Sequence, residues 1–204
     1  IEETARENLR NPEYYKTTMY CLEAFLALDD TQKLYIAGPS EDISQLISAI
    51  GISLPREGRK GMTFTTYDNL NSPPDVKIMG CFFVDSNTED FPLYHYQDGF
   101  YSVNTYYNKR SVAPPTSDFA RGILPLLRDY GGKQVQTIHD FIERTGLDEP
   151  RDHSIIFALH PQPGNPIQLD PDSVHYVMGH WPIQFLDYLP ESRREELLEQ
   201  VRTN

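Results

Sequence analysis

The segment from Gly61 to Val84 constrains the fold of this chain more than any other. It holds a short stretch rich in Thr and Tyr, then a turn with Pro73 and Pro74, and then a nearly continuous apolar run that begins at Lys77. An apolar run without alternation is typical of a strand covered on both faces, as in parallel sheets of α/β proteins. We therefore predict one strand on each side of the turn, within a buried sheet.

The residues before this segment predict a strand–helix–strand unit. Apolar residues recur at helical spacing over residues 13–28, and residues 33–37 favour a short strand. A second helix is expected from Ser40, which is a good N-cap, to about residue 50, where Gly51 should end it. The strand that completes the unit is expected over residues 62–67.

An aromatic ribbon is predicted over residues 93–107. Asp98-Gly99 at its centre, flanked by aromatic residues that favour strands, indicates a hairpin turn. Tyr supplies rigid amphipathic area at interfaces and in pockets, so the ribbon is a candidate partner surface or the wall of a small-ligand pocket. Cross-strand aromatic pairs that only stabilise the ribbon would explain the same residues. The tyrosines assigned to the candidate partner surface are Tyr94, Tyr96, Tyr101 and Tyr106.

Two amphipathic helices are predicted next. The first covers residues 118–130 and is capped by Ser117, and the second covers residues 134–145 and is ended by Gly146. Pro125 lies inside the first helix and should kink or divide it, because proline removes one backbone donor and clashes with the preceding turn.

The composition changes after Asp148, where prolines become frequent. Residues 154–159 are a strand candidate, residues 173–188 have an interrupted helical pattern, and residues 191–202 predict a charged amphipathic helix. We therefore predict an α/β fold in two parts. Residues 1–148 form an α/β domain with a mixed sheet flanked by helices, and residues 149–204 form a smaller His- and Pro-rich, partly helical module.

Four of the six histidines lie in this C-terminal module. Histidine ligates transition metals and acts as a general base near neutral pH. The spacing matches no common metal motif, so we favour histidines of loops and surfaces. The alternative is a divalent transition metal site of a metal-assisted hydrolase, formed by His153, His160, His175 and His180 with Asp170 or Asp172.

Charge and cysteine content narrow the class of protein. Lys and Arg number 18 against 30 Asp and Glu, a net charge of −12, which argues against a nucleic-acid partner. No apolar stretch is long enough for a membrane span, and no signal peptide is recognisable. Cys21 and Cys81 do not make a disulfide framework, which favours reduced thiols in a cytoplasmic protein. Because the chain starts at Ile1, we expect an N-terminal portion to be missing.

Catalytic motifs are not recognisable in the sequence. It contains no nucleophile elbow, phosphate loop, zinc-spaced Cys/His set or dinucleotide fingerprint. We therefore assign no catalytic residue, predict no cofactor apart from the alternative metal, and favour a protein that is not an enzyme.

A family resemblance supplies the functional expectation. A helix, a strand and a second helix lead into Leu54-Pro55 and Arg56, then TFTTY at residues 63–67, then prolines and a strand to Gly80. This order resembles the bacterial GTPase-associated protein family, and helices around Phe119 and Phe141 extend the resemblance to roughly residues 18–146.

The resemblance implies a multidomain adaptor or regulator encoded beside small GTPases, in bacterial conflict or defence systems. It implies no catalytic residue. The leading hypothesis is thus a non-enzymatic module that acts by protein–protein contacts, with a partner such as a small GTPase. The metal-assisted hydrolase and a small-ligand sensor are the alternatives.

Overall fold

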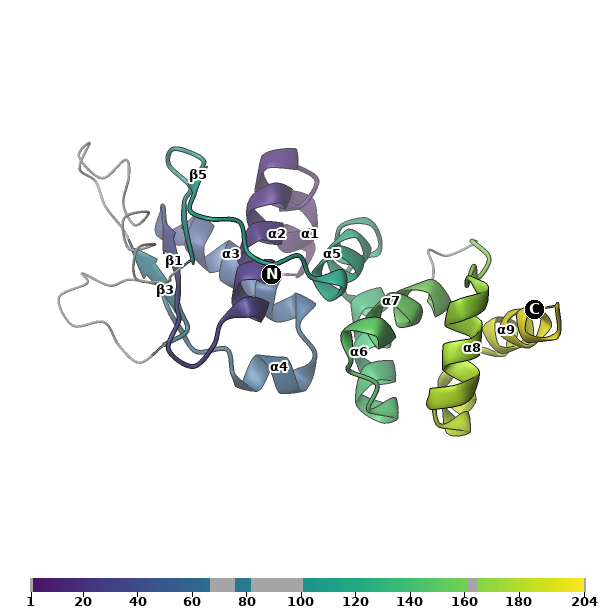
Figure 1. Ribbon diagram of the computed structural model, residues 1–204. Coiled ribbons are helices and arrows are strands. Elements are labelled where there is room, and N and C mark those ends of the chain that lie inside the picture. The colour runs from purple at the N-terminus through teal and green to yellow at the C-terminus, as the bar shows by residue number, and fades with distance from the viewer. Residues whose placement is uncertain (1, 67–75, 82–100, 161–164, 204) are drawn as a thin grey trace.

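The sheet is the centre of a mixed α/β fold. The structure, a computed structural model, describes residues 2–66, 76–81, 101–160 and 165–203 (Figure 1). Within these residues five strands form one sheet in the order β2-β3-β1-β4-β5. The first four are mutually parallel, and β5 is antiparallel to β4. The strands are β1 (Leu34–Ala37), β2 (Phe64–Thr65), β3 (Ile78–Cys81), β4 (Tyr101–Asn104) and β5 (Lys109–Arg110). The predicted mixed sheet flanked by helices is confirmed.

The two central strands are buried on both faces, as their composition predicts. All four residues of β1 and all four of β3 are buried. Leu34 and Ile36 belong to the main core, whereas Tyr35 and Ala37 face the opposite side with Met79. The apolar run from Lys77 is confirmed as a strand up to Cys81, and its remaining residues lie outside the described ranges.

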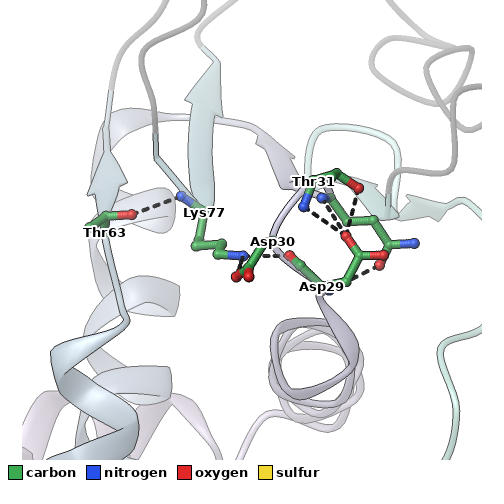
Figure 2. Close-up of polar contacts among 6 residues, drawn as sticks. Asp29, Asp30, Thr31, Thr63 and Lys77 are labelled. Atoms are coloured by element: carbon green, nitrogen blue, oxygen red, sulfur yellow. Dashed lines mark hydrogen bonds and ion pairs between the residues drawn. The ribbon is translucent and has the colours of Figure 1, made fainter.

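A polar cluster holds the chain where it enters β1 (Figure 2). The Asp29 carboxylate accepts hydrogen bonds from the Thr31 N–H at 2.8 Å and hydroxyl at 2.7 Å, which forms a side-chain-mediated turn. The Lys77 ammonium donates to the Asp29 carbonyl and lies 3.4 Å from an Asp30 carboxylate oxygen. The Lys77 N–H donates to the Thr63 hydroxyl at 3.0 Å. One lysine thus links the entries of β1, β2 and β3.

The two long helices of the first half pack on the sheet. Helix α2 (Pro12–Ala27) is confirmed, and Asn11 caps it by accepting from the N–H groups of the next turn. Helix α3 (Ser40–Ser53) begins where predicted, but Pro39 occupies the N-cap position and no side chain caps it. The remaining two are α1 (Glu2–Asn8) and the short α4 (Arg56–Lys60).

The predicted end of α3 at Gly51 is wrong, because the helix continues to Ser53. Ser53 is fully buried and its hydroxyl donates to the Ala49 carbonyl at 2.8 Å, while Leu54 enters the main core. Burial of these residues outweighs the preference of glycine for helix ends.

The middle helices follow the prediction closely. Helix α5 (Asp118–Tyr130) is capped by the Ser117 hydroxyl, which accepts from the Ala120 N–H. Pro125 lies inside α5 without dividing it. Helix α6 (Gly132–Thr145) ends at Gly146, whose φ of 69° is the left-handed conformation that glycine adopts without strain.

The strand predicted over residues 154–159 is wrong, because this segment belongs to helix α7 (Pro150–Leu159). A capping box between Glu149 and Asp152 begins the helix, with Pro150 in its first turn. A short apolar run has no periodicity that separates a buried strand from a buried helix, and these caps decide the outcome.

The chain ends in a helical region, as predicted. It comprises α8 (Pro171–His180), the 3-10 helix η3 (Ile183–Tyr188) and α9 (Glu191–Thr203). In Figure 1 the sheet lies at one end of the molecule and α9 at the other, with α5, α6 and α7 between them. No structural finding tests a domain boundary at residue 148, so that division stays a prediction. No helix in the described ranges is long and apolar enough to cross a membrane.

Both cysteines are buried, and neither forms a disulfide within the described residues. Cys21 lies in α2 and Cys81 in β3. Burial raises the pKa of the Cys21 thiol to about 12, so this thiol stays protonated and unreactive near neutral pH.

Candidate functional site

The structure describes two of the four tyrosines of the predicted partner surface, Tyr101 and Tyr106. Tyr106 is 40% exposed in the turn between β4 and β5, beside Tyr107, which is 43% exposed. Tyr101 is half-buried and packs against the main core. Tyr94 and Tyr96 lie outside the described residues, as does the predicted Asp98-Gly99 turn. Between the two described tyrosines, Tyr106 therefore offers a partner more accessible surface than Tyr101 does.

The described turn of the ribbon lies at residues 105–108. There β4 reverses into β5, and Asn108 has a φ of 50°. Strand β4 has β1 on its other side, so both of its edges are occupied. Burial and the nearby Asp42 carboxylate raise the pKa of the Tyr106 hydroxyl, which keeps it a neutral hydrogen-bonding group.

Two of the candidate metal-binding histidines make contacts of their own. His153 Nε2 lies 2.9 Å from an Asp148 carboxylate oxygen, and its ring packs against Phe119 with centroids 5.1 Å apart. His160 is buried, its Nδ1 donates to the Ile156 carbonyl at 3.0 Å, and its Nε2 has no hydrogen-bond partner in the described chain.

The other candidates lie along α8. His175 is exposed, and His180 stacks on Tyr176 with ring centroids 4.6 Å apart. Asp170 caps the helix by accepting from the Ser173 N–H at 2.8 Å. Across the described ranges no group of three or more His, Cys, Asp or Glu side chains is placed to hold a metal ion. The structure therefore does not bring the histidines and Asp170 together.

Buried histidines should make stability depend on pH. Burial lowers the pKa of His160 and that of His139, whose Nε2 lies 3.0 Å from the Ser53 carbonyl oxygen. The unfolded chain then binds more protons as the pH falls below the ordinary histidine pKa of about 6.5, so stability is lost on acidification. We expect the free energy of unfolding to fall by about 1 kcal/mol between about pH 7 and pH 5.

Urea unfolding at a series of pH values measures this loss. His160→Leu should reduce the slope of stability against pH, whereas His175→Gln, at an exposed position, should leave it unchanged. Carboxylates with lowered pKa values, such as Asp29 and Asp170, titrate in a more acidic window and do not interfere. Equal slopes for the parent chain and His160→Leu would contradict the assignment to His160.

A groove of about 750 Å³ lies where α2, the α3–α4 junction, α5 and α6 meet, and we call it the acidic groove. Its apolar lining is Leu26, Ala27, Leu54, Pro55, Pro115, Phe119 and Ile142. Its carboxylates are Glu23, Glu57, Asp118, Glu143 and Asp148. The remaining lining residues are Gly58, Thr116, Ser117, Gly146 and His153. None of these described lining residues is a lysine or an arginine.

Buried core side chains form the floor of the acidic groove. Leu54, Phe119 and Ile142 are 1%, 4% and 4% exposed. Leu54 follows the last turn of α3, where its N–H donates to the Ile50 carbonyl. Leu26, which is 41% exposed, forms part of the wall. The floor is therefore rigid, and apolar surface remains accessible above it.

Hydrogen bonds across elements fix the rim. The Glu143 carboxylate accepts from the Arg56 N–H at 2.8 Å, which joins α6 to α4. The Glu23 carboxylate accepts from the Ser117 N–H at 3.2 Å, which holds the start of α5 against α2. The Asp118 carboxylate accepts from the Ser154 hydroxyl at 3.2 Å. The carboxylates thus have defined positions around the apolar floor.

Little positive charge offsets the rim. Arg121 Nε lies 3.4 Å from Glu23 but its side chain is 58% exposed, and the Lys60–Glu57 pair is also exposed. Exposed ion pairs are screened by water and contribute little. Glu57, Asp118, Glu143 and Asp148 are exposed, whereas Glu23 is buried, so the acidic groove combines an apolar floor with a negative rim.

Sequence reasoning did not identify this groove. Its walls come from four segments between residues 23 and 153, and no short-range pattern connects them. The sequence feature that could have pointed to the groove is the excess of acidic residues. It predicts the sign of the surface charge but not where on the surface the charge lies.

The fold and groove define a mixed α/β protein with a helical C-terminal region. Residues 7–91 match the family model described as GTPase-associated protein 1, middle domain. The resemblance to the GTPase-associated protein family is thereby confirmed for this segment. No curated protein and no solved structure matches the chain. The matched segment contains α2, α3 and α4, which form one wall of the acidic groove, whereas α5 and α6 lie beyond it.

Proposed function

We propose that this chain is a non-enzymatic adaptor or regulatory module of a bacterial GTPase-linked system, with a role in defence that the family resemblance implies. It acts through protein–protein contacts, and its partner is a small GTPase. The match of residues 7–91 to the GTPase-associated protein 1 middle domain carries the proposal.

Exposed apolar residues support a role in protein contacts. Ile183 is 72% exposed and Met178 55%, both in the C-terminal helical region, and Phe64 on β2 is 52% exposed. Tyr106 and Tyr107 add an aromatic pair at the β4–β5 turn. Aromatic residues are enriched among those that dominate binding energy at interfaces.

Affinity purification of the full-length protein from its native host, followed by mass spectrometry, tests the proposal. We expect a small GTPase to be recovered, in amounts that differ between GTP-loaded and GDP-loaded lysates, because a regulator distinguishes the two states. Recovery of no GTPase in either state would contradict the GTPase link.

Tyr106→Ala tests the aromatic surface in the same assay with purified components. We expect binding of the recovered GTPase to weaken about tenfold, the loss typical of an interface tyrosine. Leu198→Ala is the matched control, because Leu198 is 37% exposed on α9, an element that supplies none of the exposed apolar residues named above. Equal affinities of the two variants would exclude Tyr106 from the interface.

A further inference from the structure

We propose that the acidic groove binds a cationic amphipathic segment of a partner protein. Apolar side chains of that segment contact Leu26 and Pro115 above the buried floor, and its Lys or Arg side chains pair with the rim carboxylates. The inference rests on the proposed function only in requiring a protein partner. It does not require that the partner be a GTPase.

The exposed apolar lining above the floor provides the attraction for apolar anchors. Water over Leu26 and Pro115 is released when an apolar side chain replaces it, and this release is the main driving force of protein association. The floor is also preformed, since Leu54 and Ile142 belong to the main core. Binding then orders few groups of this chain, which lowers its entropic cost.

The rim determines the charge of the occupant. Asp118 and Asp148 are exposed, and each has a neutral or weakly basic neighbour, Ser154 or His153, rather than Lys or Arg. The cations Arg56, Arg59 and Lys60 line a second hollow that shares Glu143 with the acidic groove, and none of the three lines the groove itself. A partner's cations are therefore expected at the Asp118–Asp148 side of the groove.

The arrangement favours a protein segment over a small cation. A buried apolar centre surrounded by exposed polar groups is the common anatomy of protein interfaces. An amphipathic helix that places apolar residues in a groove and charged residues along its sides fits this anatomy. A second copy of this chain fits it poorly, because two molecules of net charge −12 repel each other.

The test uses the full chain and a fluorescent peptide of about 14 residues, with Leu at helical spacing along one face and Lys elsewhere. Fluorescence anisotropy measures its affinity. A scrambled peptide of the same composition controls for attraction to the acidic surface as a whole. We expect the patterned peptide to bind at least about tenfold more tightly, because the scrambled one cannot place its leucines together.

Matched variants locate the site. Asp118→Asn with Asp148→Asn should weaken binding at least about fivefold through the loss of two ion pairs, and Leu26→Ser should do so through the loss of apolar contact. Asp172→Asn with Asp187→Asn removes two exposed carboxylates elsewhere, and Leu198→Ser changes a leucine that is 37% exposed on α9. These controls should bind like the parent chain.

Four outcomes would overturn the inference. One is equal binding of the patterned and scrambled peptides, and a second is an equal effect of the groove and control variants. Another is a thermal shift with spermine that the groove variants abolish, without peptide binding, which would indicate a small cationic ligand. The last is a dimer in sedimentation that the groove variants dissociate, which would indicate a second copy.

The GTPase proposal fails separately from this inference. Peptide binding by the parent chain without recovery of a GTPase would leave the groove assignment intact. Conversely, a GTPase could be recovered whose affinity is unchanged by the groove variants, while the parent chain binds no peptide. That result would support the GTPase proposal and contradict the groove assignment.

Discussion

Gly80→Ala is expected to lower the free energy of unfolding by about 3 kcal/mol, near the upper end of the usual cost of overpacking. A Cβ at Gly80 would lie 2.7 Å from Ile43 Cγ2 and 2.9 Å from the Thr65 carbonyl oxygen, closer than the 3.0 Å limit of real Cβ contacts. One of these neighbours is backbone of the adjacent strand β2, which cannot move aside by changing a rotamer. The substitution should therefore push β3 away from β2 and α3.

Urea unfolding followed by circular dichroism measures the loss. Gly179→Ala is the matched control, because a Cβ there would have nothing within 4 Å and the residue lies in α8. Alanine favours the helix, so this control should gain up to about 1 kcal/mol. If both variants were as stable as the parent chain, β2 would not pack on Gly80 as closely as the structure indicates.

Local composition was sufficient to predict the central strands and most helices. Leu34–Ala37 and Ile78–Cys81 are apolar without alternation, and burial on both faces requires that pattern. Asn11 and Ser117 begin α2 and α5 with side-chain caps, and Gly146 ends α6 in the conformation that favours glycine. At these positions a few neighbouring residues determine the backbone.

Predictions failed where distant contacts determined the backbone. Gly51 stays helical because the residues after it, Ser53 and Leu54, are buried. The neighbouring sequence does not show that these two residues are buried. Residues 154–159 are β-branched and apolar enough for a strand, yet they form a helix that packs against α5 through Phe119 and Phe157. Tertiary packing outweighs a short-range preference in both cases.

The candidate site was less predictable than the fold for the same reason. Leu26 and Glu143 are ordinary residues of two amphipathic helices, 117 positions apart, and only the packing of α5 between sheet and C-terminal helices brings both to one groove. Conversely, the four histidines between His153 and His180 are close in sequence but form no metal-binding group among the described residues. His153 lies on α7, whereas His175 and His180 lie on α8. Sequence proximity is a poor guide to a site formed by helices.

Asp152→Ala is expected to cost about 3 kcal/mol, because this one carboxylate holds two elements together. Asp152 is 3% exposed, accepts from Trp181 Nε1 at 2.7 Å, and accepts from the Glu149 N–H at 3.2 Å in the capping box of α7. Its loss leaves a buried indole N–H without a partner and removes one of the two hydrogen bonds of the capping box. Trp181 is the only tryptophan, so its fluorescence during urea unfolding reports this contact directly.

Asp172→Ala, at an exposed position in the first turn of α8, is the control and should leave both emission and stability nearly unchanged. Asp152→Asn should lie between the two, since its amide oxygen still accepts from the indole while the charge is lost. Unchanged emission and stability in Asp152→Ala would mean that α7 and α8 are held by apolar packing alone.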